Sequence, residues 1–214
     1  MEREAFLRRD NWAGFYYELA LRSPIKGDLQ ALQPIVAALW SSPELVGPWQ
    51  ERENINDPPR TDIVVEAEEI TSYYGILHVA DRIHVGCHTS TFDEPGNFSW
   101  LSLCIPSGML GNYYQIRYPL DHSNNPWLQE LDAALLRIAV NTFRLAPYQL
   151  GLIGEEILAV VGEGADASAG ESLLQSKELD DGGVIVTSSF LGASARAASA
   201  EVLAPGLLWF PRND

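Results

Sequence analysis

Three of the four histidines in this chain lie within eleven residues, together with one of its two cysteines. His78, His84, Cys87 and His88 are residue types that bind transition metals through an imidazole nitrogen or a thiolate sulfur. A structural zinc site uses four such ligands, and a catalytic site uses three beside an open position. The question is therefore whether the fold brings these side chains to one point.

The segment 73–92 is typical of a β-hairpin, because apolar and polar residues alternate on both sides of a central turn. A two-residue turn at residues 81–82 would mix polar and apolar side chains on both faces. A three-residue turn at residues 80–82 pairs His78 with His84 and collects Leu77, Val79, Ile83, Val85 and Cys87 on one apolar face. Since register follows the hydrophobic pattern, we favour the three-residue turn.

In that register His78 and His84 are cross-strand neighbours, with Cβ atoms roughly 5 Å apart. Cys87 points to the apolar face, and His88 lies about 13 Å beyond His84 along the strand. We therefore predict His78 and His84 as a candidate metal pair that still needs a third ligand. The alternative is a half-exposed sheet face whose polar side chains bind no metal.

Residues 162–167 match the Gly-x-Gly-x-x-Ala fingerprint of dinucleotide-binding folds, after an apolar run at 157–161. Glu163 and Asp166 would lie beside the bound phosphate and repel it. The match also comes too late in the chain for a doubly wound sheet to follow. We interpret the segment as a Gly- and Ala-rich linker and predict no cofactor.

Nucleophilic catalysis has no clear signature here, because no Gly-x-Ser-x-Gly elbow occurs. His122, between Asp121 and Ser123, has a residue type suited to acid–base chemistry. Cys104 with a histidine would make a Cys–His pair. Loop histidines are more often exposed, however, and a single strand cysteine usually packs in a core. The catalytic residues remain unassigned, and we favour a protein that is not an enzyme.

The elements that position these residues indicate an α+β fold: a mostly antiparallel sheet of about five or six strands, with two main helices packed on one face. Strands are expected at 12–22, 62–70, 98–105 and 147–161, besides the hairpin. One helix is expected over 29–41, or from Pro34. Asn125 is expected to cap another, with Pro126 at its first position and an apolar stripe of Leu128, Leu131, Leu135 and Ile138. We expect a main domain at 1–161 and a Gly-, Ala- and Ser-rich C-terminal annex at 162–214 that docks on it.

The net charge of −15, from 14 basic and 29 acidic residues, bounds the classes of partner. A nucleic-acid binder needs a basic surface, and an anionic membrane would repel this chain. No run approaches the roughly 18 apolar residues of a membrane span, and two cysteines are too few for a disulfide framework. We expect a soluble, cytoplasmic protein whose acidic surface binds a basic protein partner. Glu66, Glu68 and an exposed Trp49 are the candidate contacts.

Several short segments carry a resemblance: Tyr17-Glu18-Leu19, the aromatic, Gly and Pro positions from Ala38 to Trp49, and Leu150 to Gly154. Over roughly residues 12–155 they resemble bacterial proteins of unassigned function, and the resemblance carries no functional residue across. By analogy, compact acidic α+β proteins are often immunity proteins that neutralise a basic toxin.

The leading hypothesis is therefore a non-enzymatic intracellular binding protein of the immunity type. One alternative is a metal-dependent enzyme centred on His78 and His84. Another is a small-ligand sensor whose pocket is lined by the face that carries Trp100. A homodimer is left open.

Overall fold

The chain folds around one large antiparallel sheet, as a computed structural model shows for residues 2–66, 70–81, 83–93, 98–157, 182–191 and 199–212. The strands are β1 (Tyr16–Lys26), β2 (Leu45–Trp49), β3 (Ser72–Ala80), β4 (Ile83–Asp93), β5 (Phe98–Pro106), β6 (Leu150–Glu155), β7 (Gly183–Thr187), β8 (Glu201–Ala204) and β9 (Leu207–Phe210). The helices are α1 (Arg3–Leu7), α2 (Gln33–Trp40), α3 (Ser107–Leu110), α4 (Leu128–Leu145) and α7 (Ser188–Leu191), with 3₁₀ turns η1 (Arg9–Trp12), η2 (Leu29–Leu32) and η3 (Arg52–Asn54).

The sheet has nine strands in the order β2-β3-β4-β5-β1-β6-β7-β9-β8, and every neighbouring pair is antiparallel. The expected sheet of about five or six strands with two main helices is therefore wrong. Strand β2 was missed because its Gly47 and Pro48 are typical of loops. Residues 62–66, expected as a strand for their alternation, form none, because they have no ladder partner.

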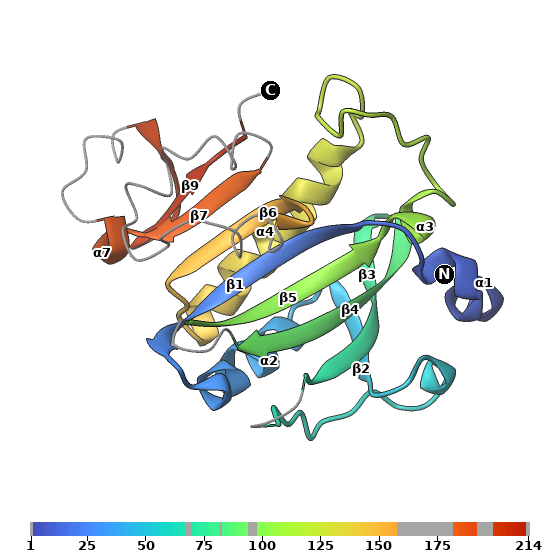
Figure 1. The fold of residues 1–214 in the computed structure, drawn as a ribbon, viewed down its shortest axis with the longest axis horizontal. Coiled ribbons are helices and arrows are strands. Elements are labelled where there is room, and N and C mark those ends of the chain that lie inside the picture. Colours follow the sequence, from blue (N-terminus) through green and yellow to red (C-terminus); the bar gives the residue numbers. More distant parts are fainter. Residues whose placement is uncertain are drawn as a thin grey trace.

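Helices α2 and α4 cover one face of the sheet, and Figure 1 shows both behind the strands. The main core lies between them and that face. Helix α4 forms because its apolar residues recur every three or four positions. The stripe predicted from the sequence is fully buried: Leu128, Leu131, Leu135 and Ile138.

Helix α2 begins at Gln33, next to Pro34, which agrees with one of the two helix starts expected from the sequence. Pro34 lies in its first turn, where a missing N–H breaks no helical hydrogen bond. The preceding turn η2 is capped by Asp28, whose carboxylate accepts a hydrogen bond of 3.3 Å from the Ala31 N–H. Asn125, expected to cap the second main helix, instead binds the loop before it: its side-chain oxygen accepts from the Arg117 N–H at 2.8 Å.

The β3–β4 hairpin pairs His78 directly with His84, which confirms the favoured register of the two histidines. The expected three-residue turn is wrong. Ala80 pairs with Ile83, so that two residues form the turn, and the register shifts between His78 and Ala80. The extra residue, Val79, keeps its side chain in the core at 4% exposure.

On the sheet face opposite α2 and α4, one row of paired residues crosses six strands. From β2 to β6 it contains Trp49, Tyr74, His88, Cys104, Glu18 and Gly154. Directly paired residues of antiparallel strands project from the same face. This cross-sheet row therefore places an aromatic ring, an imidazole, a thiol and a carboxyl side by side.

Strands β7, β8 and β9 come from the segment expected to form a C-terminal annex. They continue the same sheet beyond β6, since β7 pairs with β6 over residues 183–186. The proposed boundary at residue 162 stays a prediction, and the dinucleotide-like segment 162–167 lies outside the described residues. In the part of the chain that the structure describes, no helix is long and apolar enough to cross a membrane.

Candidate functional site

A cavity of about 380 Å³ lies where residues 2–13, called the N-terminal segment below, and η3 meet strands β1, β3 and β4. Four rings line it, those of Trp12, Tyr16, Tyr74 and His88. Three charged side chains line it as well, those of Arg9, Asp10 and Arg52. Its volume falls at the lower end of the roughly 300–1,000 Å³ found for small-molecule sites.

The N-terminal segment is fixed over the sheet by backbone and ring contacts. Trp12 donates its indole N–H to the Phe6 carbonyl at 2.5 Å, and its ring meets the Phe6 ring edge to face at 5.1 Å. The Gly108 N–H donates to the Ala13 carbonyl at 3.1 Å. A Cβ at Gly108 would lie 2.5 Å from the Asp10 carbonyl oxygen, so only glycine permits this approach. These contacts hold one wall of the cavity in place.

The rings of the cavity pack mainly through edge-to-face contacts. Trp12 and Tyr74 meet at 5.3 Å between centroids and 82° between planes, and Tyr16 meets His88 at 5.3 Å and 78°. The Arg52 guanidinium lies over Trp12 at 5.4 Å and at 6.0 Å from the Tyr74 centroid. Such contacts stabilise each pair by about 0.5–1.5 kcal/mol beyond burial and make the cavity preformed.

His88 belongs to the cross-sheet row and lies between Tyr74 on β3 and Cys104 on β5. Burial lowers its pKa to about 4, so the imidazole is neutral at pH 7. Its Nδ1 is buried and has no hydrogen-bond partner among the described residues. Gly86, two residues earlier on the same face, leaves space for Met109 and Trp12, because a Cβ there would lie 2.7 Å from the Met109 methyl group and 3.3 Å from the Trp12 ring. His88 therefore lines the cavity with a neutral ring, while its unpaired Nδ1 lies beneath the surface.

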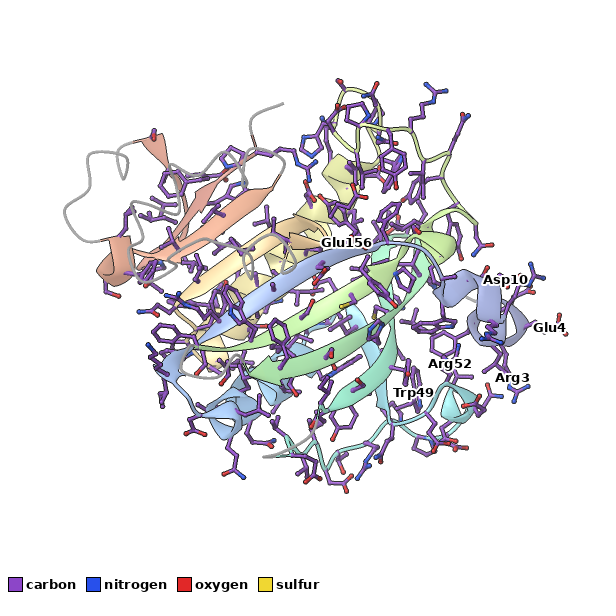
Figure 2. The ribbon with its side chains drawn as sticks, in the orientation of Figure 1. Arg3, Glu4, Asp10, Trp49, Arg52 and Glu156 are labelled. Atoms are coloured by element: carbon purple, nitrogen blue, oxygen red, sulfur yellow. The ribbon has the colours of Figure 1, made fainter. Side chains whose placement is uncertain are left out.

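The next members of the row form a buried acid–thiol pair. Ser102 donates its hydroxyl to Glu18 at 2.6 Å and lies 3.2 Å from the Cys104 sulfur. Burial raises the pKa of Glu18 to about 7; the Ser102 hydrogen bond opposes this shift, and the charge of Glu156 adds to it. Figure 2 shows Glu156 at the end of β6, beside β1. Glu18 thus exchanges its proton near neutral pH, but it is only 6% exposed.

Cys104 and His88 do not form a reactive Cys–His pair in this structure. Burial raises the pKa of the Cys104 thiol to about 12, and that of His88 is lowered to about 4. A thiol this weakly acidic does not transfer its proton to an imidazole this weakly basic. The arrangement is suited to holding a ligand by packing and hydrogen bonding, and it offers no activated nucleophile.

The hairpin brings together the candidate metal pair, His78 and His84, but their two rings stack on each other. Their ring centroids are 4.2 Å apart and their planes are inclined by only 18°. Nitrogen lone pairs lie in the ring plane, so those of nearly parallel rings do not converge on one ion about 2.1 Å from each. In the described residues no group of three or more His, Cys, Asp or Glu side chains is placed to hold a metal. The geometry therefore gives little support to a metal-dependent enzyme.

The three candidate partner contacts do not form one exposed surface. The expectation that Trp49 is exposed is wrong: its ring is 3% exposed and donates its N–H to the Asp57 carbonyl at 2.9 Å. Glu66 is exposed, and its backbone N–H donates to the Thr71 hydroxyl at 2.9 Å. Glu68 lies outside the described residues. Of the three, only Glu66 is a described side chain that a partner can reach.

His122 takes part in a network that joins loop, sheet and C-terminus. Its Nε2 lies 2.8 Å from a carboxylate oxygen of Asp132, whose other oxygen accepts a 2.5 Å hydrogen bond from the Tyr17 hydroxyl. Arg212 donates to that same Tyr17 hydroxyl and to the Leu120 carbonyl. Tyr17 is fully buried, so the contact between His122 and Asp132 is best explained as part of a structural network.

Sequence reasoning missed the cavity itself. Its residues come from the N-terminal segment, from η3 and from three strands, and no short motif connects Trp12 with Arg52 or with His88. The density of aromatic residues at 12–17 was the only signal available. The chain matches no family model, no curated protein and no solved structure. The chemistry of the site therefore has to be inferred from its geometry.

Proposed function

We propose that this chain is a binding protein for a small aromatic molecule, which it holds in the cavity between the N-terminal segment and the sheet. The observation that carries the proposal is one preformed cavity lined by four rings, those of Trp12, Tyr16, Tyr74 and His88. This proposal keeps the small-ligand alternative but assigns the binding site to a different part of the molecule from the one expected from the sequence. Trp100, expected to line the pocket, is only 4% exposed.

The chemistry of the walls defines the ligand. Ring faces and edges favour a planar aromatic partner, and each contact is worth about 0.5–1.5 kcal/mol. For a molecule the size of indole, a gain of roughly 0.5 kcal/mol per non-hydrogen atom corresponds to a dissociation constant near 0.1–1 mM.

Ligand-observed NMR with indole as the probe tests the proposal. We expect saturation transfer from the protein to indole and a saturable titration in the range above. Tyr74→Leu removes one ring of the wall while keeping apolar volume, and it should weaken indole binding several-fold. Tyr113→Leu is the matched control, because Tyr113 is 41% exposed and lies outside the cavity.

Two results would count against the proposal. One is the absence of saturation transfer to indole at millimolar concentration with folded protein. The other is equal loss of binding in Tyr74→Leu and Tyr113→Leu, which would place indole elsewhere on the molecule. Thermal unfolding of both variants shows that each is folded before the comparison is made.

Binding of a basic protein partner, as in an immunity protein, stays a second proposal. It is supported by the net charge of −15 and by the exposure of Glu66. Its test is a binding measurement with a partner encoded beside this chain, using the wild type and Glu66→Lys. Reversing one charge at a true interface weakens binding and slows association, whereas an unchanged affinity removes Glu66 from the interface.

A further inference from the structure

We propose that the molecule bound in the cavity is an aromatic monoanion, and that Arg9 and Arg52 bind its negatively charged group. This inference rests on the proposed function, because it names the chemical class of ligand for the same cavity. It is carried by the charges that line the cavity and by the position of Arg52.

The cavity is locally cationic in a strongly acidic protein. Acidic residues outnumber basic ones 29 to 14 in the chain, yet two arginines and one carboxylate, Asp10, line this cavity. Elsewhere Arg60 and Arg137 form ion pairs with carboxylates. Neither Arg9 nor Arg52 forms an ion pair or a side-chain hydrogen bond with any described residue. Their donors are therefore free for a ligand.

Arg52 is held in place without using its donors. Its guanidinium lies over the faces of Trp12 and Tyr74, at 5.4 Å and 6.0 Å. A guanidinium that stacks on a ring still directs its N–H groups outward in its own plane, where they match the two oxygens of a carboxylate. Figure 2 shows Arg52 and Asp10 on two segments that both lie next to α1. An aromatic ring that occupies the cavity thus places its substituent beside this cation.

The balance of charges selects a single negative charge. Among the side chains that line the cavity, Arg9 and Arg52 contribute two positive charges and Asp10 one negative charge, a net charge of +1. A carboxylate or another monoanionic group compensates it. The charges of Glu18 and Glu156 also act on Tyr16 and oppose any further negative charge there. A second negative charge on the ligand would lie beside Asp10 uncompensated. The class is therefore an aromatic carboxylate or a similar monoanion, and not a neutral or cationic aromatic molecule.

Isothermal calorimetry with three indoles of similar shape tests the charge directly. The probes are indole-3-acetate, indole-3-acetamide and tryptamine, which carry a negative charge, no charge and a positive charge. We expect indole-3-acetate to bind about tenfold more tightly than the acetamide, and tryptamine to bind least. The preference should shrink as salt rises from about 0.02 M to 0.5 M, because these side chains are close to solvent.

Variants assign the preference to the two arginines. Arg9→Gln and Arg52→Gln should each reduce the acetate-to-acetamide ratio several-fold. In Arg52→Gln the acetamide should also bind somewhat less tightly, because the stacking of Arg52 on Trp12 and Tyr74 is lost. Asp10→Asn should increase the ratio, since it removes the opposing charge. Arg8→Gln is the matched control: it removes the same charge from the exposed residue next to Arg9, outside the cavity, and should leave the ratio unchanged.

The outcomes separate the two proposals. Equal affinities for all three probes would overturn the inference about charge and leave the aromatic site standing. A ratio that falls equally in Arg8→Gln and Arg9→Gln would also overturn it, because the effect would then reflect net charge alone. An unchanged acetate-to-acetamide ratio in Arg52→Gln, with both affinities reduced equally, would overturn its role in binding the anion and show that Arg52 only holds the rings. If neither indole nor any of the three probes binds, the proposed function itself fails.

Discussion

Replacing Glu18 by glutamine should stabilise the protein, and increasingly so as the pH rises. Glu18 is a buried member of the cross-sheet row, and its pKa is raised from 4.5 to about 7, mainly by burial. Glutamine keeps the shape of the side chain and an oxygen that accepts the hydrogen bond from Ser102. The substitution therefore removes the charge with little change in packing.

The magnitude follows from the shift. A carboxyl whose pKa is higher in the folded state holds its proton there after the unfolded chain has lost it. The stabilising contribution of the Glu18 carboxyl is therefore fully present below pH 4.5. It decreases as the pH rises toward 7 and changes no further above about that pH. The rise in the pKa of Glu18 from 4.5 to about 7 corresponds to a change of about 3 kcal/mol in the free energy of unfolding. Between pH 5 and pH 8 the advantage of Glu18→Gln over the wild type should therefore grow by about 2.5 kcal/mol.

His88 makes this comparison of variants necessary. Its pKa is lowered from 6.5 to about 4, so its contribution has the opposite sign and stability rises with pH through that window. In the wild type the two slopes nearly cancel between about pH 4.5 and 6.5. In Glu18→Gln the rise due to His88 is no longer opposed by Glu18, and the free energy of unfolding should increase up to about pH 6.5.

Urea unfolding monitored by tryptophan fluorescence, at pH 5 and pH 8, measures the effect. Glu66→Gln serves as the control because that carboxylate is exposed. A difference between Glu18→Gln and the wild type that is the same at both pH values would refute the reasoning. It would mean that Glu18 is solvated in the folded state and that the row is open to water.

Three further predictions concern packing and reactivity. Gly183→Ala should destabilise the protein by about 3 kcal/mol, because the new Cβ would lie 1.7 Å from the Trp209 ring. Urea unfolding measures this loss of stability. A loss below about 0.5 kcal/mol, the cost of an ordinary surface substitution, would contradict the prediction. Tyr17→Phe should cost about 1–3 kcal/mol, since the buried carboxylate of Asp132 loses its 2.5 Å hydrogen bond; an unchanged midpoint would speak against this bond. Cys104 should react with a disulfide reagent only after unfolding, because its thiol is buried and its pKa is raised to about 12; rapid modification of the native protein would contradict its burial.

Local patterns predicted those parts of the fold in which neighbours in sequence decide the outcome. The stripe from Leu128 to Ile138 predicted the buried face of α4, and the alternation in 73–92 predicted the pairing of His78 with His84. Strand β2 was not predictable in this way, because Gly47 and Pro48 oppose strand formation and only its pairing with β3 stabilises it.

The cavity was beyond sequence reasoning for a different reason. Tyr16, Tyr74 and His88 become neighbours only through the strand order β3-β4-β5-β1, which no single segment encodes. The arginines of the cavity lie in segments that carry no recognisable motif. The histidine cluster drew attention to β4, where the sequence pattern favoured His84 with His78, whereas the histidine that lines the cavity is His88.

The most direct test of the account is the indole N–H signal of Trp12 in a ¹H–¹⁵N spectrum during titration with indole-3-acetate. Trp12→Phe assigns the signal, and the signals of Trp100 and Trp209, which lie outside the cavity, serve as internal controls. We predict a saturable shift of the Trp12 signal with little movement of the other two. A stationary Trp12 signal under conditions in which indole-3-acetate binds, or equal shifts of all three, would contradict it.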